Sequence, residues 1–155
     1  MALSSIAQKW NGNIPPKFKP HKGLFEYAKI NGDIFAKPLV FMNESGKAIA
    51  AAAREFGAKP EDVMIIHDDS DIPIGDFKIS FGKNAAGHRG VQSIIDALKS
   101  KNFTRIRIGI RPKTETRRKK AGAFVLAQIT KEDKTAFEMV FNEIESNIQK
   151  LLTNS

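Results

Sequence analysis

The chain has 155 residues, of which 41% are hydrophobic and 27% are charged, a composition typical of a folded globular domain. No apolar run approaches the roughly 20 residues that cross a bilayer, and the start lacks the basic and apolar regions of a secretory signal. The absence of cysteine excludes disulfides and thiolate chemistry and argues against structural zinc. We therefore expect one cytoplasmic, monomeric domain over residues 1–155, with no membrane contact.

The formal net charge of +8 points to a polyanionic partner, of which nucleic acid is the commonest. Cations are densest in residues 111–120, where Arg111-Pro112-Lys113 is followed by Arg117-Arg118-Lys119-Lys120. The alternative is a basic surface that only keeps the protein soluble.

The first third of the chain predicts a short helix, a hairpin and a second helix. Apolar spacing favours a helix over residues 3–10, and prolines then keep the chain extended. Residues 24–30 and 34–41 flank Asn31-Gly32, which suits the tight turn of a β-hairpin. An alanine-rich helix follows over residues 46–56.

The central stretch is an apolar run over residues 63–66, which predicts a strand buried on both faces. We expect the strand to stop at His67 and a loop to carry Asp68, Asp69 and Asp71. In open α/β sheets, the chemistry lies just beyond the carboxyl ends of such strands. These carboxylates could orient a histidine, hold magnesium, or form only a solvated loop.

The second half alternates strands and helices. A half-buried strand is predicted over residues 77–81, and a glycine-rich, basic loop over 82–90 leads into a helix and could bind an anion. Arginines and isoleucines alternate in a strand over 105–110, and a short strand or extended segment is expected over 122–129. With a final helix over 131–152, the pattern predicts one three-layer α/β/α domain with a mixed, twisted sheet.

Four segments in order resemble the bacterial-type peptidyl-tRNA hydrolases: residues 41–47 (FMNESGK), 67–75 (HDDSDIPIG), 87–90 (GHRG) and 105–110 (RIRIGI). The resemblance runs from about Lys19 to the final helix. It implies hydrolysis of the ester that joins a peptide to the 3′ end of a tRNA, without metal or other cofactor.

The resemblance also implies roles for particular side chains. The family activates water with a histidine that an aspartate orients, and asparagines place the substrate. Asp68 matches the orienting carboxylate, and Asn43 matches a placing amide. Phe41 is expected to stack on the terminal adenine, and the loop with His88 and Arg89 to touch the substrate. The residues that match the family's grip on tRNA phosphate are Arg107, Lys78 and Lys83.

Two departures from the family pattern bear on activity. The family opens with a strand, a glycine-rich loop bearing an asparagine, and an Arg-His-Asn motif that carries the catalytic histidine, and this sequence has no match to them. Its histidines (His21, His67 and His88) are not assigned that role by motif, and Arg89 replaces a usual asparagine. We therefore expect impaired hydrolysis, with His88 as an alternative base and a non-catalytic tRNA- or RNA-binding relative as the competing hypothesis.

The unmatched opening strand has a structural consequence as well. In the family it is central to the sheet, and its neighbours have unpaired apolar edges without it. We expect that the sheet closes differently, that the sequence is a fragment, or that another chain fills the gap.

Overall fold

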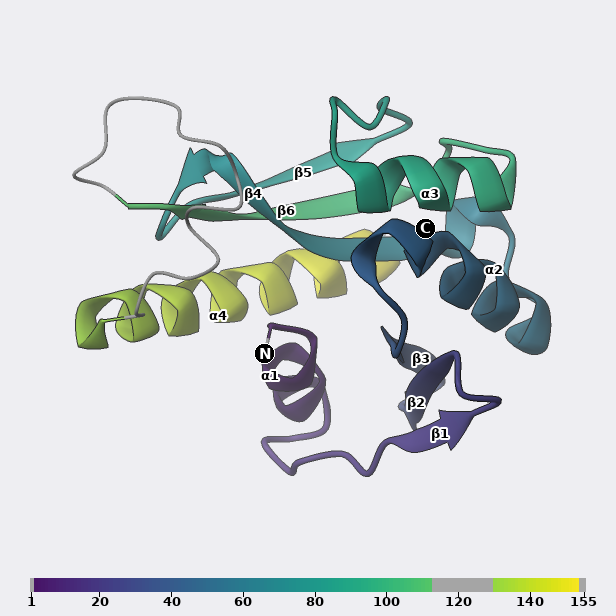
Figure 1. Cartoon of the computed structure of the whole chain (residues 1–155). Helices are drawn as coiled ribbons and strands as arrows, with labels where there is room; N and C mark the ends of the chain where they lie inside the picture. The colour runs from purple at the N-terminus through teal and green to yellow at the C-terminus, as the bar shows by residue number, and fades with distance from the viewer. Residues whose placement is uncertain (1, 113–129, 154–155) are drawn as a thin grey trace.

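The structure is a computed structural model that describes residues 2–112 and 130–153 (Figure 1). The predicted strand over 122–129 and most of the basic loop lie outside these residues. The elements are α1 (Ala2–Trp10), β1 (Lys19–His21), β2 (Phe25–Ile30), β3 (Asp33–Pro38), η1 (Met42–Glu44), α2 (Ser45–Phe56), η2 (Pro60–Asp62), β4 (Met64–Pro73), β5 (Phe77–Phe81), α3 (Arg89–Leu98), β6 (Thr104–Arg111) and α4 (Lys131–Thr153).

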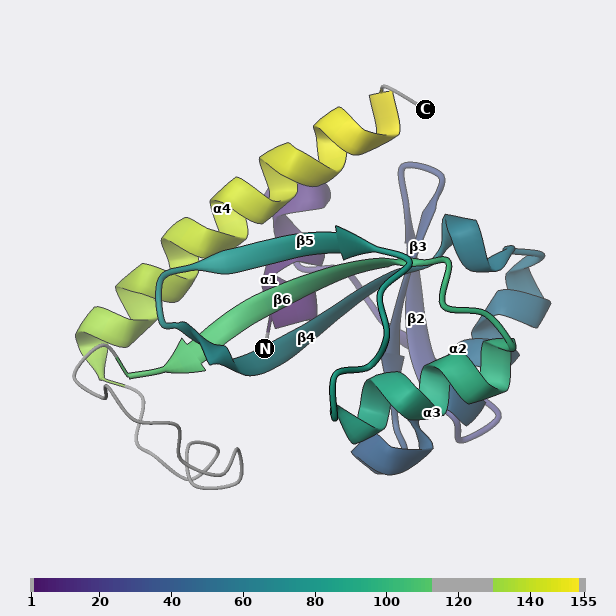
Figure 2. The same ribbon diagram turned by 90° about the horizontal axis from the view of Figure 1, so that it is seen from above.

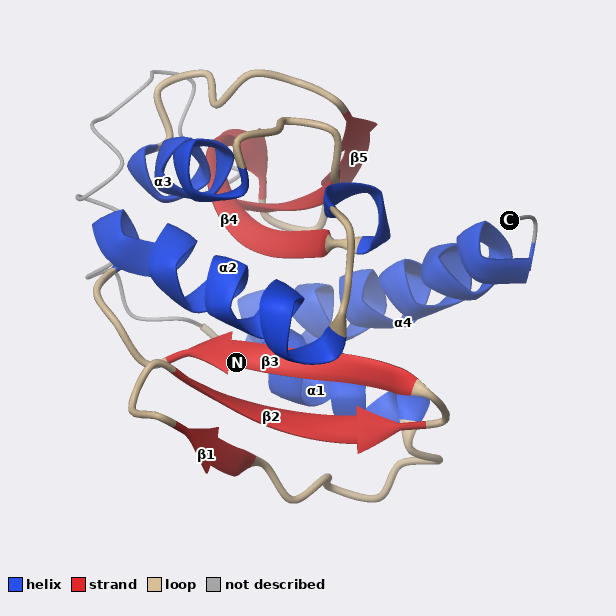
Figure 3. Ribbon diagram, turned by 90° about the vertical axis from the view of Figure 1, so that its right-hand side faces the viewer, coloured by secondary structure: helices blue, strands red, loops and turns tan. Residues whose placement is uncertain are grey.

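The described strands form two three-stranded sheets. One is antiparallel in the order β1-β2-β3, and the other has the order β4-β6-β5, with β4 parallel and β5 antiparallel to β6. Figure 2 shows β6 between β4 and β5, and Figure 3 shows β3 and β4 as the facing members of the two sheets. The predicted α/β fold with a mixed sheet is confirmed, and the strands are divided between two sheets.

The predicted hairpin and second helix are confirmed. Asn31 and Gly32 have φ values of 52° and 92°, so the turn uses the two left-handed residues that an Asn-Gly pair supplies. β2 and β3 pair from Ile30↔Asp33 outward. Helix α2 ends at Gly57, whose φ of 70° provides the left-handed cap.

The predicted loop over residues 68–71 is wrong, because β4 continues through the acidic segment to Pro73. The Asp69 carboxylate is stabilised within the strand because Nε of Arg107 on β6 donates to its Oδ2 at 2.7 Å. The register between β4 and β6 shifts between Asp69 and Pro73. At this irregularity a Cβ on Gly109 would lie 1.9 Å from the Pro73 carbonyl oxygen, so only glycine fits. The prediction that this strand is buried on both faces is only partly confirmed, since Ile65 of β4 is buried but Ile66 is half-buried.

Helices cover both faces of the mixed sheet. Figure 1 shows α4 below it and α3 above it. Ile106 and Ile108 pack with Phe141 and Ile144 of α4 and with Ile6 of α1. On the other face, Ile65 packs with apolar residues of α3. Helix α2 joins the two sheets, because it packs on the hairpin through Ala48 and Ala52 and on α3 through Gly46. Among the described helices, none is long and apolar enough to span a membrane.

Candidate functional site

An apolar groove of about 530 Å³ lies between the two sheets. Residues 36–38 of β3 and 64–68 of β4 contribute to its walls. Leu3 of α1 and Phe137 and Phe141 of α4 line it, and so do Ile49 of α2 and Val91 and Ile94 of α3. The groove therefore runs along the outer edge of β4 and ends where the acidic segment begins.

Two of the sequence-predicted site residues line this groove directly, namely Asp68 from β4 and His88 from the start of α3. Asn43 does not line it, but Met42 and Ser45 on either side do. The Phe41 side chain, just before η1, is 80% exposed. Arg89 is the exposed first residue of α3, next to Gly90 in the groove wall. The structure thus places Asp68 and His88 on the wall of the same groove and leaves Asn43 and Arg89 one residue from that wall.

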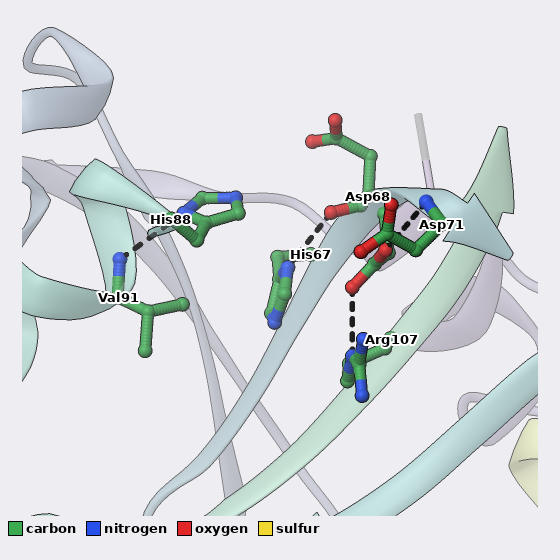
Figure 4. Close-up of polar contacts among 7 residues, drawn as sticks. His67, Asp68, Asp71, His88, Val91 and Arg107 are labelled. Atoms are coloured by element: carbon green, nitrogen blue, oxygen red, sulfur yellow. Dashed lines mark hydrogen bonds and ion pairs between the residues drawn. The ribbon is translucent and has the colours of Figure 1, made fainter. Parts of the chain in front are cut away.

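The acidic segment does not form a cluster suited to magnesium. Asp69 is engaged by Arg107 and also accepts the backbone N–H of Asp71 at 2.8 Å. Over residues 2–112 and 130–153 there is no group of three or more histidines and carboxylates placed to hold a metal ion. The Asp68 side chain points away from the His67 ring, as expected for successive residues of a strand (Figure 4).

His67 is a site residue to which sequence reasoning gave no role. Its ring lies edge-on to that of His88, with the ring centroids 4.5 Å apart. Nδ1 lies 2.8 Å from the Asp68 carbonyl oxygen. Because a carbonyl only accepts hydrogen bonds, Nδ1 carries the proton, and Nε2 of the neutral ring is unprotonated and can only accept. Nε2 is buried and has no hydrogen-bond partner in the described part of the chain, and burial lowers the pKa of His67 below its ordinary value of 6.5.

His88 has the opposite proton arrangement. It is the N-cap of α3, and its Nδ1 accepts the backbone N–H of Val91 at 3.2 Å. A backbone N–H only donates, so Nδ1 is unprotonated and Nε2 of the neutral ring carries the proton. His88 therefore brings a hydrogen-bond donor, rather than a base, to the groove (Figure 4).

The predicted phosphate-binding cations lie on the mixed sheet and the loop after it. Arg107 is opposite Lys78 across the β5–β6 pair, and Lys78 and Lys83 are exposed. The Arg107 side chain is 26% exposed, and its Nε is already paired with Asp69. Arg105, two residues earlier, is only 4% exposed and is covered on the face that α3 packs against. The Arg–Ile alternation placed both arginines on one face, but it gave no sign that Arg105 is buried.

Comparisons with known proteins agree on one family. The sequence model of the family described as peptidyl-tRNA hydrolase matches residues 1–155. The chain is 39% identical over 155 residues to the peptidyl-tRNA hydrolase of Lactobacillus johnsonii, a match that covers 98% of this chain and 80% of that protein. The Lactobacillus gasseri peptidyl-tRNA hydrolase is also 39% identical, over 152 residues, with 96% of this chain and 78% of the relative covered.

Solved structures support the fold. A crystal structure of a peptidyl-tRNA hydrolase in complex with N-propanol superposes with a TM-score of 0.78 at 22% identity, covering 98% of this chain and 76% of that one. The Acinetobacter baumannii peptidyl-tRNA hydrolase superposes with a TM-score of 0.76 at 21% identity. The match covers 96% of this chain and 77% of that one. The chain, with its groove between two sheets, belongs to the peptidyl-tRNA hydrolase family.

Proposed function

We propose that this chain binds peptidyl-tRNA with the ester at the mouth of the groove, and that its reaction is hydrolysis of that ester to free tRNA and peptide. The observation that carries the proposal is that Asp68 and His88, from separate elements, both line one apolar groove. The proposal places the protein in the cytoplasm, because peptidyl-tRNA arises in translation. It also takes the protein to be a monomer with a single domain.

The groove offers several groups that suit ester hydrolysis. The Nε2–H of His88 can donate to an oxygen of the substrate, and the Asn43 amide, at the rim, can position it. The Asp68 carboxylate suits orientation of a histidine that activates water. Phe41, exposed beside the groove, offers a ring face on which the terminal adenine can stack.

What the described groove lacks is an accessible base. His88 Nε2 carries a proton, and His67 Nε2 is buried. His21, on β1, stacks on Phe25, and its Nε2 lies 3.4 Å from Oε2 of Glu55. It is not one of the residues that line the groove. General-base assistance is worth about a hundred- to ten-thousand-fold in rate. We therefore propose that these 155 residues alone bind the substrate and turn it over slowly.

A second candidate function is tRNA binding without catalysis, and the same lack of an accessible base favours it. For either function, tRNA phosphates would contact Lys78, Lys83 and Arg89, which are exposed. Arg107 would contribute through the guanidinium N–H groups other than Nε, which its ion pair with Asp69 occupies.

Binding to the groove is tested with a peptidyl-tRNA analogue that carries an amide in place of the ester and is not cleaved. Phe41→Ser should raise the Kd of the analogue about 5- to 150-fold, because stacking of one base is worth about 1–3 kcal/mol. The matched control is Met139→Ser on α4, a residue that is 61% exposed and does not line the groove. Equal affinities of the two variants for the analogue would contradict the proposal that the terminal adenine stacks on Phe41.

A further inference from the structure

The first turn of α2 is capped by a side chain from another helix. In most helices, the side chain of the N-cap residue accepts the backbone N–H of the second or third helical residue. Here Glu44, the N-cap of α2, pairs with Lys47 instead. The backbone N–H of Gly46 donates to Oγ of Ser93 on α3 at 3.1 Å. The start of α2 is therefore fixed to a helix that lies 47 positions further along the chain.

Two close backbone approaches support the same attachment. A Cβ on Gly46 would lie 2.0 Å from the carbonyl oxygen of Ser93. On the same face of α3, three residues earlier, a Cβ on Gly90 would lie 3.0 Å from Cγ of Met42 and 3.2 Å from its carbonyl oxygen. Figures 1 and 3 show α2 running beside α3. The turn before α2 thus rests on the first turn of α3.

This attachment sets where two groups of site residues lie relative to each other. Phe41 and Asn43 come directly before α2, and His88 is the N-cap of α3. The backbone N–H of Glu44 donates to the Phe41 carbonyl oxygen at 2.8 Å, so the turn over residues 41–44 is closed and moves with the start of α2. The place of Phe41 and Asn43 beside His88 therefore depends on the contact between α2 and α3.

We propose that Ser93 is a positioning residue for substrate binding. Its hydroxyl holds the turn over residues 41–44 against α3, so that Phe41 and Asn43 reach the same end of the tRNA as His88. Ser93 acts through this turn and is not one of the residues that line the groove. The inference rests on the proposed function for the use of Phe41 and Asn43, whereas the placement of the turn is independent of it.

The placement is tested on the protein without ligand. Ser93→Ala removes the acceptor of the Gly46 N–H, so hydrogen exchange followed by NMR should show the Gly46 amide exchanging about 2- to 30-fold faster, the factor to which loss of a helix cap corresponds. The matched control is Ser146→Ala on α4, whose hydroxyl donates to the Asn142 carbonyl oxygen of its own helix. Ser146→Ala should leave the exchange of Gly46 unchanged.

The use of this placement is tested with the uncleaved amide analogue of peptidyl-tRNA. Ser93→Ala should raise the Kd of the analogue at least about threefold, and Ser146→Ala should not change it. Because Ser93 acts through the turn, Ser93→Ala should raise the Kd by a smaller factor when Phe41→Ser is already present. A serine that only stabilises the fold would cost the same factor in both backgrounds. Ser93→Thr keeps a hydroxyl, and its Kd and its Gly46 exchange should either both match the unmodified protein or both rise.

The proposal is overturned if Ser93→Ala leaves the exchange of Gly46 unchanged, because the hydroxyl then does not hold the turn. It is also overturned if Phe41→Ser raises the Kd and Ser93→Ala does not, or if Ser93→Ala costs the same factor in both backgrounds. In these two outcomes the proposed function stands. A Kd that neither substitution changes would instead reject the proposed place of the substrate, and the positioning role with it.

Discussion

His67 and His88 are neighbours of the same residue type, but their hydrogen bonds fix different tautomers of the neutral ring. The Nδ1 of His67 donates to a carbonyl, whereas that of His88 accepts from a backbone N–H. Sequence motifs placed both histidines near the site. They could not show which nitrogen carries the proton, since that depends on the partner that each ring meets after folding.

Burial lowers the pKa of His67, and this makes folding stability depend on pH. The unfolded chain binds a proton at His67 below about pH 6.5, while the folded chain keeps the ring neutral until a lower pH. The contribution of His67 to the free energy of unfolding is therefore fully present above about pH 6.5 and is lost as the pH falls below that value. After burial, the hydrogen bond to the Asp68 backbone raises the pKa of His67, the charges of His88 and Arg105 lower it, and the charge of Asp69 raises it.

His67→Asn should make the free energy of unfolding less sensitive to pH, because asparagine keeps a donor near the Asp68 carbonyl and does not titrate. Urea unfolding of both proteins at about pH 7.5 and about pH 5.5 measures the difference. The protein with His67 should lose more stability on acidification than the variant. Equal losses would mean that the buried ring has an ordinary pKa.

Among the elements, helices and the hairpin followed from sequence, whereas the end of β4 did not. Asn31-Gly32 and Gly57 specify local backbone conformations, so the hairpin turn and the end of α2 could be predicted from neighbouring residues alone. The extension of β4 through Asp68–Pro73 depends on Arg107 and Gly109, which are about 40 positions away in sequence. A run of carboxylates is typical of a loop unless such a partner is known.

Helices α2 and α3 meet at a close backbone contact that one substitution should break. A Cβ on Gly46 would lie 2.0 Å from the backbone carbonyl oxygen of Ser93. Gly46→Ala should therefore lower the free energy of unfolding by about 1–3 kcal/mol or more, as overpacking does. The control is Lys47→Ala on the exposed face of the same helix, with an expected change within about 0.5 kcal/mol. Unchanged stability of Gly46→Ala in urea unfolding would contradict the close approach of the two helices.

At the scale of the whole molecule, the division of the strands into two sheets could not be predicted from the sequence pattern. The sequence pattern identified the described strands other than β1, and it predicted that Met64 and Ile66 belong to a strand covered on both faces. In the structure they are half-buried and line the groove. Which strands become neighbours depends on pairing across the whole chain. The groove and its combination of Asp68 and His88 therefore appear only once the sheets are placed.

The net charge of +8 leads to a prediction for binding of whole tRNA. Phosphate contacts by lysine and arginine release counterions, so the affinity should fall about 10- to 100-fold between about 50 and about 200 mM salt if three or four contacts form. Lys83→Ala should reduce the slope of log K against log salt by about one and weaken different tRNAs equally. Lys150→Ala, exposed near the end of α4, should not change it. An affinity that is insensitive to salt would exclude tRNA phosphate as the partner.

The most direct test of the account is the rate of peptidyl-tRNA hydrolysis by two chains. One is the 155-residue protein, and the other is the same chain extended by the opening segment of the Lactobacillus johnsonii relative, which the family resemblance predicts to carry the catalytic histidine. We expect the 155-residue protein to be slower by about a hundredfold or more, and Asp68→Ala in the extended chain to abolish most of the gain. Hydrolysis by the 155-residue protein that is as fast as the increased rate expected of the extended chain would contradict the account, because a histidine of the described groove would then have to serve as the base.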